Sequence, residues 1–395
     1  MNILIAGDFC PQARVKTLCE EGKCSDVLGE AKAIVEKADF SIVNLECPVT
    51  RGEEKPIEKK GPNLRCSEKG VEALKWAGFD CVTLANNHLL DFGAKGVSNT
   101  IETCRKYGIE TVGGGMNLKD ASQTLYKTIG EKTLAIINCC EHEFSIATTT
   151  TAGANPLNSI QQFYAIKEAR TKADYVLVIV HGGHEHWQLP STRMQETYRF
   201  FVDAGADAVV NHHQHCFSGY EIYREKPIFY GLGNFCFDAP KVKPGIWNEG
   251  YMLQINLNDN LNLNFNDNLN ETPNSSTTQQ LNNFQLSKFI IHPYLQCMEN
   301  PCVKFVEPTA YNKRLEELND IIADPEQLRR QQREYYRKDA IKYKELFEPL
   351  DLRLFRALRK RGWMPSLFSQ RRKLMAKDFI ECESHRDRLI YHLNN

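Results

Sequence analysis

Residues 176–187 read VLVIVHGGHEHW, an apolar and largely β-branched run that ends in three histidines and a glutamate. A second run, VVNHHQH at 209–215, repeats this arrangement further along the chain. Six of the eleven histidines lie in these two windows, each directly after a strand-like segment. The two windows therefore predict that buried strands carry histidine side chains to a shared site.

Short β-rich runs alternate with helical patterns over residues 1–240, which is typical of an α/β domain. Helices are expected at 25–38, with Ser25 or Asp26 as the N-cap, at 67–78, closed by Gly78, and at 191–205, ending at Gly205. The expected strands lie at 3–6, 41–45, 81–85, 134–138, 175–180, 208–210 and 228–230.

The sequence pattern divides the chain into an α/β domain at 1–255, an Asn-rich insert with completing strands at 256–310, and a helical basic extension at 311–395. In the insert, alternation of Leu or Phe with polar residues predicts a strand or hairpin, and NETPNSSTTQQ predicts an exposed loop or disordered segment. The clearest helical pattern of the extension is QLRRQQREYYRKDAIKYKELF.

The composition is that of an ordinary water-soluble protein, with 395 residues and a formal net charge of -1. This balance gives no general attraction to nucleic acid, so we expect no nucleic-acid partner. The fourteen cysteines are irregularly spaced beside apolar runs, which favours buried free thiols in a reducing compartment. MNILIAGD leads directly into a strand, so we expect no signal peptide, no transmembrane segment and a cytoplasmic location.

Polar side chains follow the expected strands at the points where these end. Ligands of open α/β sheets bind beyond the carboxyl ends of the strands, so these side chains are expected to form one cluster. They are Asp8 after ILIAG, Glu46 after SIVNL, Asn87 and His88 after VTLAN, His181 after VLVIV, His212, His213 and His215 after DAVV, and Asn234 after IFYGLG.

Carboxylate and amide oxygens together with imidazole nitrogens are the usual ligands of Zn, Mn or Fe. Two such ions about 3.5–4 Å apart can hold both the attacking and the leaving oxygen of a phosphoester, which favours hydrolysis over a redox reaction. Each element alone also has an ordinary structural interpretation, such as a turn at ANNHLLDFG. The coincidence of all the strand ends favours a metal or phosphate site.

The motifs GD (7–8), VNLE (43–46), LANNHLLDFG (84–93), HGGHE (181–185), AGADAVVNHHQH (204–215) and YGLGNFCFD (230–238) together resemble the CapA/PgsA-type capsule, or poly-γ-glutamate, synthesis family. This family is related to the calcineurin-like metallophosphoesterases. The resemblance implies an α/β, metallophosphoesterase-like sandwich of two mixed sheets flanked by helices, followed by a mainly helical C-terminal extension. It also implies a centre of two divalent ions, Mn, Fe or Zn, at the strand ends.

The resemblance further implies roles for individual residues. The catalytic residues would be Asp8 and His88, with His88 stabilising the reacting group or protonating the leaving oxygen. The metal ligands would be Asp8, Glu46, Asn87, His181, His213 and His215. Supporting or substrate-facing residues would be Cys10, Asp91, His184, Glu185, His186, His212 and Asn234, with Glu185 supporting His181.

Two positions depart from the pattern of the related families. Cys10 stands where metallophosphoesterases place the histidine of Asp-x-His, which leaves open whether both ions are held. Asn211 stands where the family commonly has glycine before its histidines.

The basic C-terminal segment has no acidic residue between Asp351 and Asp378, but nine lysines and arginines. One interpretation is a solvated helix pair with an apolar side formed by Leu354, Phe355, Leu358, Trp363 and Phe368. The other is a site for an anionic polymer, a phosphorylated lipid carrier or a membrane surface.

We therefore predict a metal-dependent hydrolase of the phosphatase or phosphodiesterase type, linked to capsule or exopolysaccharide biosynthesis. Its partners would be an anionic polymer or phosphorylated glycan intermediate and other capsule-synthesis proteins, in the cytoplasm or at the membrane periphery. Two alternatives stay open: a non-catalytic polymer-binding or assembly component, and an amide hydrolase of a γ-glutamyl polymer.

Overall fold

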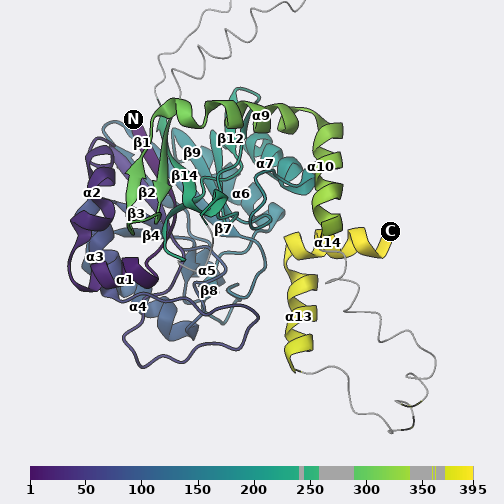
Figure 1. The fold of residues 1–395 in the computed structure, drawn as a ribbon, viewed down its shortest axis with the longest axis horizontal. Helices are drawn as coiled ribbons and strands as arrows, with labels where there is room; N and C mark the ends of the chain where they lie inside the picture. The colour runs from purple at the N-terminus through teal and green to yellow at the C-terminus, as the bar shows by residue number, and fades with distance from the viewer. Residues whose placement is uncertain (240–243, 258–288, 339–357, 359–360, 362–369, 395) are drawn as a thin grey trace, which may run out of the picture.

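Two β-sheets pack face to face, and helices cover their outer faces (Figure 1). The computed structural model describes residues 1–239, 244–257, 289–338, 358, 361 and 370–394. The residues of the Asn-rich insert from 258 to 288 and most of the basic segment at 353–369 lie outside the described part of the chain. The expectations for these two regions, including the apolar side of the predicted helix pair, therefore stay predictions.

The first sheet is built around β1 (Asn2–Cys10), which has two parallel neighbours and one antiparallel neighbour. Its strand order is β16-β15-β14-β1-β2-β3-β4, and β13 also pairs with β1. The other strands are β2 (Phe40–Leu45), β3 (Cys81–Thr83), β4 (Glu110–Val112), β13 (Asn234–Phe237), β14 (Glu249–Asn256), β15 (Phe289–Gln296) and β16 (Val303–Phe305).

The second sheet is centred on β9 (Tyr175–His181), the strand formed by the opening apolar run of the sequence. Its order is β11-β12-β10-β9-β7-β6. The other strands are β6 (Leu125–Ile129), β7 (Lys132–Cys140), β10 (Ala208–His212), β11 (Tyr220–Tyr223) and β12 (Lys226–Phe229). A separate pair joins β5 (Gly114–Gly115) to β8 (Gly153–Ala154).

Alternation along β1 separates two hydrophobic cores. Ile3 and Ile5 face the second sheet and pack in the same cluster as Ile136 and Val178, whereas Leu4 and Ala6 face the helices on the other side. Those helices are α1 (Ala13–Glu20), α2 (Cys24–Val35), α3 (Glu68–Ala77) and α4 (Gly93–Lys106). The second sheet is covered by α6 (Ser159–Arg170) and α7 (Thr192–Ala204), while the short helix α5 (Leu118–Ala121) packs beside β5.

The described residues from 312 onward are mainly helical and lie on one side of the sandwich (Figure 1). The helices are α9 (Asn312–Ala323), α10 (Pro325–Lys338), α13 (Gln370–Glu381) and α14 (Glu383–Asn394); the 3₁₀ turns η1 (Ile246–Asn248) and η2 (Pro308–Ala310) precede them. The predicted helical character of this region is confirmed for its described residues. No helix within the described ranges combines the length and the apolar composition needed to cross a membrane.

The predicted α/β class with two mixed sheets is confirmed, and each strand predicted between residues 3 and 230 is present. Ser67 caps α3 by accepting a hydrogen bond from the Lys69 N–H, and Gly78 ends that helix with a φ of 96°. The prediction of Ser25 or Asp26 as the N-cap of α2 is wrong. This helix begins at Cys24, so both residues lie within its first turn.

All fourteen cysteines are free, and every one except Cys302 is buried, which confirms that they act as small core residues.

The register of the strands brings the ends of both sheets to the same edge. Asp8 lies level with Asn44 of β2 and Asn234 of β13, while His181 lies level with His212 of β10. The polar residues that follow the strands are therefore gathered at one end of the sandwich.

The close approach of β1 to the 231–234 turn gives a test of the fold. A Cβ atom on Gly7 would lie 1.9 Å from the backbone oxygen of Gly233, whereas a Cβ on Gly29, in the exposed face of α2, would meet nothing within 4 Å. We expect Gly7→Ala to lower the free energy of unfolding by at least about 1–3 kcal/mol, because neither backbone can yield without breaking strand pairing. Gly29→Ala should instead raise it by about 0.5–1 kcal/mol.

Chemical denaturation of the two variants measures both values, and equal effects would contradict the packing of β1 against this turn.

Candidate metal centre

Glu46 is a buried carboxylate at the centre of the polar cluster. Its backbone N–H donates to the Phe9 carbonyl at 3.0 Å and its side chain is fully buried. Within the described part of the chain, neither carboxylate oxygen has a hydrogen-bond partner. Burial, and then the neighbouring charge of Asp8, raise the pKa of Glu46 well above its usual range. Such a group is costly unless a cation neutralises it.

Three ligand atoms from other strand ends surround Nε2 of His181. The Asn87 Oδ1 lies 3.1 Å from it, the His213 Nδ1 lies 3.1 Å from it, and the Glu46 Oε1 lies 3.6 Å from it. Atoms that hold one ion tetrahedrally at about 2.1 Å are about 3.4 Å apart. The spacing and the chemistry of these side chains therefore fit a divalent ion.

A second group shares Glu46. The His215 Nε2 lies 3.5 Å from the Glu46 Oε1, and the His215 Nδ1 lies 3.6 Å from the Asp8 Oδ2. Asp8, Glu46 and His215 can each offer one atom to a common ion. The Asn44 side chain donates to the Asp8 Oδ1 at 2.7 Å and so orients this carboxylate. Glu46 belongs to both ligand groups, which is the position of a bridging carboxylate.

Burial keeps the histidines of the cluster neutral. It lowers the pKa of His181 well below the usual value, that of His215 to about 4 and that of His212 to about 3. Neutral imidazole is the form that binds metals. His212 is also unusual because neither ring nitrogen has a hydrogen-bond partner among the described residues, and its Nδ1 lies 3.4 Å from the Asp8 Oδ1.

The backbone around the cluster is strained. His213 and His215 have φ angles of 89° and 54°, and His186 and Phe144, which line the adjacent cavity, have φ angles of 59° and 55°. Each left-handed residue other than glycine costs on the order of 1 kcal/mol, and such residues concentrate at functional sites. The turn after β10 thus directs two histidines toward the carboxylates at a cost in stability.

His88 forms a charged triad with Asp91 and Lys59. The His88 Nδ1 lies 2.7 Å from the Asp91 Oδ2, and the buried ammonium of Lys59 pairs with Asp91 and lies 3.2 Å from the same ring nitrogen. Burial is the main cause that lowers the pKa of His88; the hydrogen bond to Asp91 acts against it and Lys59 adds to it. Sequence reasoning placed His88 and Asp91 here but missed Lys59, which has no motif around it.

Glu143 is a second residue that sequence reasoning missed. Its Oε2 accepts a hydrogen bond from the Asn87 Nδ2 at 2.9 Å, which turns the amide oxygen of Asn87 toward His181. Burial, and then the charges of Glu185 and Asp378, raise the pKa of Glu143 to about 8. Glu143 follows β7, so extending the strand-end argument to that strand would have found it.

The other predicted residues divide between the site and the core. Asn234 supports the centre, because its Oδ1 lies 2.9 Å from the His215 Nδ1. Glu185 groups with His213 and His215 rather than supporting His181 as expected. Two residues point elsewhere: Cys10 packs in the core between β1 and the helices, and the buried His184 lies with its Nε2 2.9 Å from the Tyr336 hydroxyl of α10.

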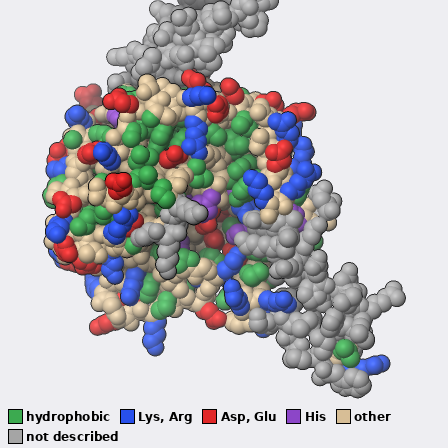
Figure 2. All heavy atoms as spheres, in the orientation of Figure 1, with side chains coloured by type: hydrophobic (Ala, Val, Ile, Leu, Met, Phe, Trp, Pro, Cys, Tyr) green, Lys and Arg blue, Asp and Glu red, His purple; other side chains and the backbone are tan. Residues whose placement is uncertain are grey.

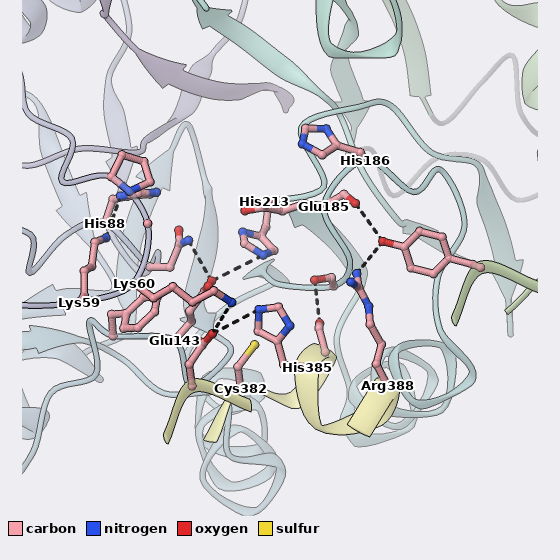
Figure 3. Close-up of a pocket in the computed structure, with 18 of the residues that line it drawn as sticks. Lys59, Lys60, His88, Glu143, Glu185, His186, His213, Cys382, His385 and Arg388 are labelled. Atoms are coloured by element: carbon pink, nitrogen blue, oxygen red, sulfur yellow. Dashed lines mark hydrogen bonds and ion pairs between the residues drawn. The ribbon is translucent and has the colours of Figure 1, made fainter. Parts of the chain in front are cut away.

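A cavity of about 470 Å³ opens beside the metal-binding cluster. Figure 2 shows histidine side chains near the middle of this face, next to acidic side chains and close to lysines and arginines. In Figure 3, His88 and Lys59 lie on one side of the cavity, His213 and Glu185 at another, and Arg388 of α14 faces them. The cavity brings mixed positive and negative charges next to the candidate centre.

The buried carboxylate of Glu46 predicts opposite effects of Glu46→Gln on the metal-free and the metal-loaded protein. When folding raises the pKa of a carboxyl group, the free energy of unfolding of the protein falls as the pH rises above the ordinary pKa of 4.5. At pH 7 without metal, the free energy of unfolding of Glu46→Gln should therefore be about 1–3 kcal/mol higher than that of wild type. This difference should vanish toward pH 4.5.

Adding Mn²⁺ or Zn²⁺ should stabilise wild type and leave Glu46→Gln nearly unchanged in thermal unfolding. Glu196→Gln, at an exposed position of α7, is the control and should behave as wild type. A metal response of Glu46→Gln equal to that of wild type would contradict the bridging position.

Comparison with known proteins identifies related chains. Residues 2–239 match the family model of the bacterial capsule synthesis protein PGA_cap. The chain is 31% identical over 268 residues to the capsule biosynthesis protein CapA of Bacillus anthracis, which covers 66% of this chain and 64% of that protein. It is 31% identical over 241 residues to the PGA biosynthesis protein CapA of Bacillus subtilis, covering 60% and 63%. The matches thus span less than two thirds of these relatives.

Solved structures overlap with the chain at lower similarity. They include a putative 5'-nucleotidase from Staphylococcus aureus, with a TM-score of 0.41, 13% identity and coverage of 72% of this chain and 57% of that chain. A 5'-nucleotidase from Candida albicans has a TM-score of 0.42 and 10% identity, and covers 85% and 57%. TM-scores below 0.5 support no conclusion about the site.

The family model accounts for more than half of the chain, including every predicted metal ligand. The chain therefore belongs to the bacterial capsule synthesis protein family.

Proposed function

We propose that this protein is a metal-dependent phosphoester hydrolase that acts in capsule or exopolysaccharide synthesis. The observation that carries the proposal is the carboxylate of Glu46, which is buried without a hydrogen bond and is shared by two groups of ligand atoms. When bound there, divalent ions would neutralise phosphoryl oxygens and lower the pKa of water. The ligand atoms of the cluster are carboxylate oxygens and imidazole nitrogens, which suit Mn, Fe or Zn.

The residues of the chain would divide the remaining work. Asp8, Glu46, Asn87, His181, His213 and His215 would hold the ions. His88 would donate a proton to the leaving oxygen, and the hydrogen bond that its Nδ1 donates to the Asp91 carboxylate fixes the ring and favours its protonated form. Lys59 would neutralise Asp91 when His88 has lost its proton. Glu143 would keep the Asn87 amide turned toward the ions.

The connection to capsule synthesis rests on the family and on the names of the relatives. These relatives are called capsule or PGA biosynthesis proteins, and the match leaves more than a third of their length uncovered. For this chain, the proposed partners are an anionic polymer or a phosphorylated glycan intermediate, and other capsule-synthesis proteins.

The first test is metal content together with turnover of p-nitrophenyl phosphate. Protein purified under reducing conditions should contain or bind Mn, Fe or Zn. His213→Ala should lose both the metal and at least about 10³-fold of the turnover, because His213 is within reach of ligand atoms in both groups. His292→Ala, on β15 and hydrogen-bonded to Gln254, should keep both. A wild-type protein that binds no metal would contradict the proposed function.

The second test separates His88 from the metal ligands. His88→Gln should retain the metal content of wild type and lower kcat by about 10²–10⁴-fold, because a general acid contributes to the rate without holding an ion. Activity should be measured with p-nitrophenyl phosphate and with a phenyl phosphate of higher leaving-group pKa. The loss should be larger for the poorer leaving group, and an equal loss for both would contradict proton donation by His88.

One observation favours a non-catalytic alternative. Cys10 lies in the apolar core rather than among the ligand atoms, so this position supplies no ligand. A binding or assembly component would bind metal and polymer normally and show no turnover across a broad panel of phosphoesters. The metal and turnover measurements above therefore distinguish the two functions.

A further inference from the structure

The wall of the cavity opposite the metal cluster comes from outside the residues that match the family model. That match ends at residue 239. Beyond it, helices α10, α13 and α14 and Cys382 between the last two line the cavity; the helices contribute Tyr335, Lys338, Asp378, Ser384, His385 and Arg388. Figure 3 shows Cys382, His385 and Arg388 projecting from these helices toward the cavity.

The first turn of α14 is fixed to the loops that carry the site. The Ser384 hydroxyl lies 2.6 Å from the Glu141 Oε2 and 2.7 Å from the Gly183 carbonyl, and both residues follow central strands of the second sheet. Glu383 accepts hydrogen bonds from the backbone N–H of His142 at 2.8 Å and contacts its ring at 2.6 Å.

An arginine of the α/β domain adds a third anchor. Arg193, in the first turn of α7, pairs with Glu141 at 2.7 Å and with Asp387 of α14 at 2.9 Å. Ionic hydrogen bonds that are largely buried hold their geometry more tightly than exposed pairs. The position of α14 relative to the metal cluster is therefore set by the same loops that follow β7 and β9.

Arg388 is a buried cation on this wall. Only 6% of it is exposed, its guanidinium lies 4.8 Å from the centroid of the Tyr335 ring, and its Nη2 donates to the Tyr335 hydroxyl at 2.5 Å. That hydroxyl donates in turn to the Glu185 carbonyl at 3.1 Å. Arg388 is thus tethered to the loop that carries Glu185, on the opposite side of the cavity from His88 and Lys59 (Figure 3).

We propose that Arg388 binds a second anionic group of the substrate, on the part of the molecule that extends away from the metal-bound phosphoryl group. This inference rests on the proposed function, because it assumes that the phosphoryl group lies at the cluster around Glu46. The substrate class is a phosphoester that carries a carboxylate or a further phosphate. Arginine suits this role, since its planar fork binds carboxylate and phosphate oxygens in pairs.

The positions of the cations explain why the second anion would be held at a distance. Lys59 is committed to Asp91 beside His88, and Lys60 lies 3.3 Å from the carboxylate of Asp378. Arg388 belongs to a different element, α14, and faces the cavity from its other side. A substrate that spans the cavity would therefore meet metal ions at one end and a guanidinium at the other.

The test compares two phosphonates with identical metal-binding heads, butylphosphonate and 4-phosphonobutyrate, by calorimetry on full-length Mn²⁺-loaded protein. Wild type should bind 4-phosphonobutyrate on the order of tenfold more tightly, because only this probe adds a carboxylate for Arg388. Arg388→Gln should bind both probes equally, with unchanged affinity for butylphosphonate. Arg386→Gln, an exposed arginine two positions away on α14, should retain the wild-type difference.

Arg388→Lys is a second variant for the case in which Arg388→Gln disturbs the packing of α14. Lysine keeps the positive charge but lacks the planar guanidinium that binds two oxygens at once. It should retain part of the difference between the probes. Equal binding of the two phosphonates by wild type, or an undiminished difference in Arg388→Gln, would overturn the role of Arg388 alone. Binding of neither phosphonate by the metal-loaded protein would instead overturn the proposed phosphoester site, and this inference with it.

Discussion

The buried carboxylate of Glu46 is the constraint on which the site depends. A carboxylate at the junction of two sheets, with no hydrogen-bond donor among the described residues, destabilises the fold unless a cation approaches it. His181, His213 and His215 surround it as neutral imidazoles rather than as cations that could pair with it. This arrangement of a buried carboxylate among neutral imidazoles is one that a divalent cation would stabilise, as the proposed function requires.

Strand register and local backbone strain together position the carboxylates and histidines around Glu46. Parallel pairing of β1 with β2 and of β9 with β10 brings Asp8 and His181 to one edge of the sandwich. Strand register does not by itself fix where the side chains of the turn after β10 point. The left-handed conformations of His213 and His215 direct both rings toward Glu46. The hydrophobic cores on both faces of the first sheet offset the free-energy cost of this backbone strain.

Sequence reasoning succeeded where the signal is local. An apolar run followed by a ligand-type residue predicts a strand end, and helical spacing closed by glycine predicts the helices that end at Gly78 and Gly205. It failed where the contact is distant in sequence. His184 follows β9 in the same way as His181 does, yet its ring packs against Tyr336 of α10, and no pattern near residue 184 contains that information.

The candidate ligands and the facing wall of the cavity come from different parts of the chain. Every candidate ligand lies within the residues that match the family, whereas the facing wall of the cavity is formed by helices beyond them. Glu141 links the two parts, because it follows β7, accepts from Arg193 and contacts Ser384 of α14. Family chains that share the strand-end residues but carry a different C-terminal region would keep the same ion-binding cluster and present a different wall to the substrate. Under the proposed function, the reaction and the choice of substrate would thus depend on different parts of the chain.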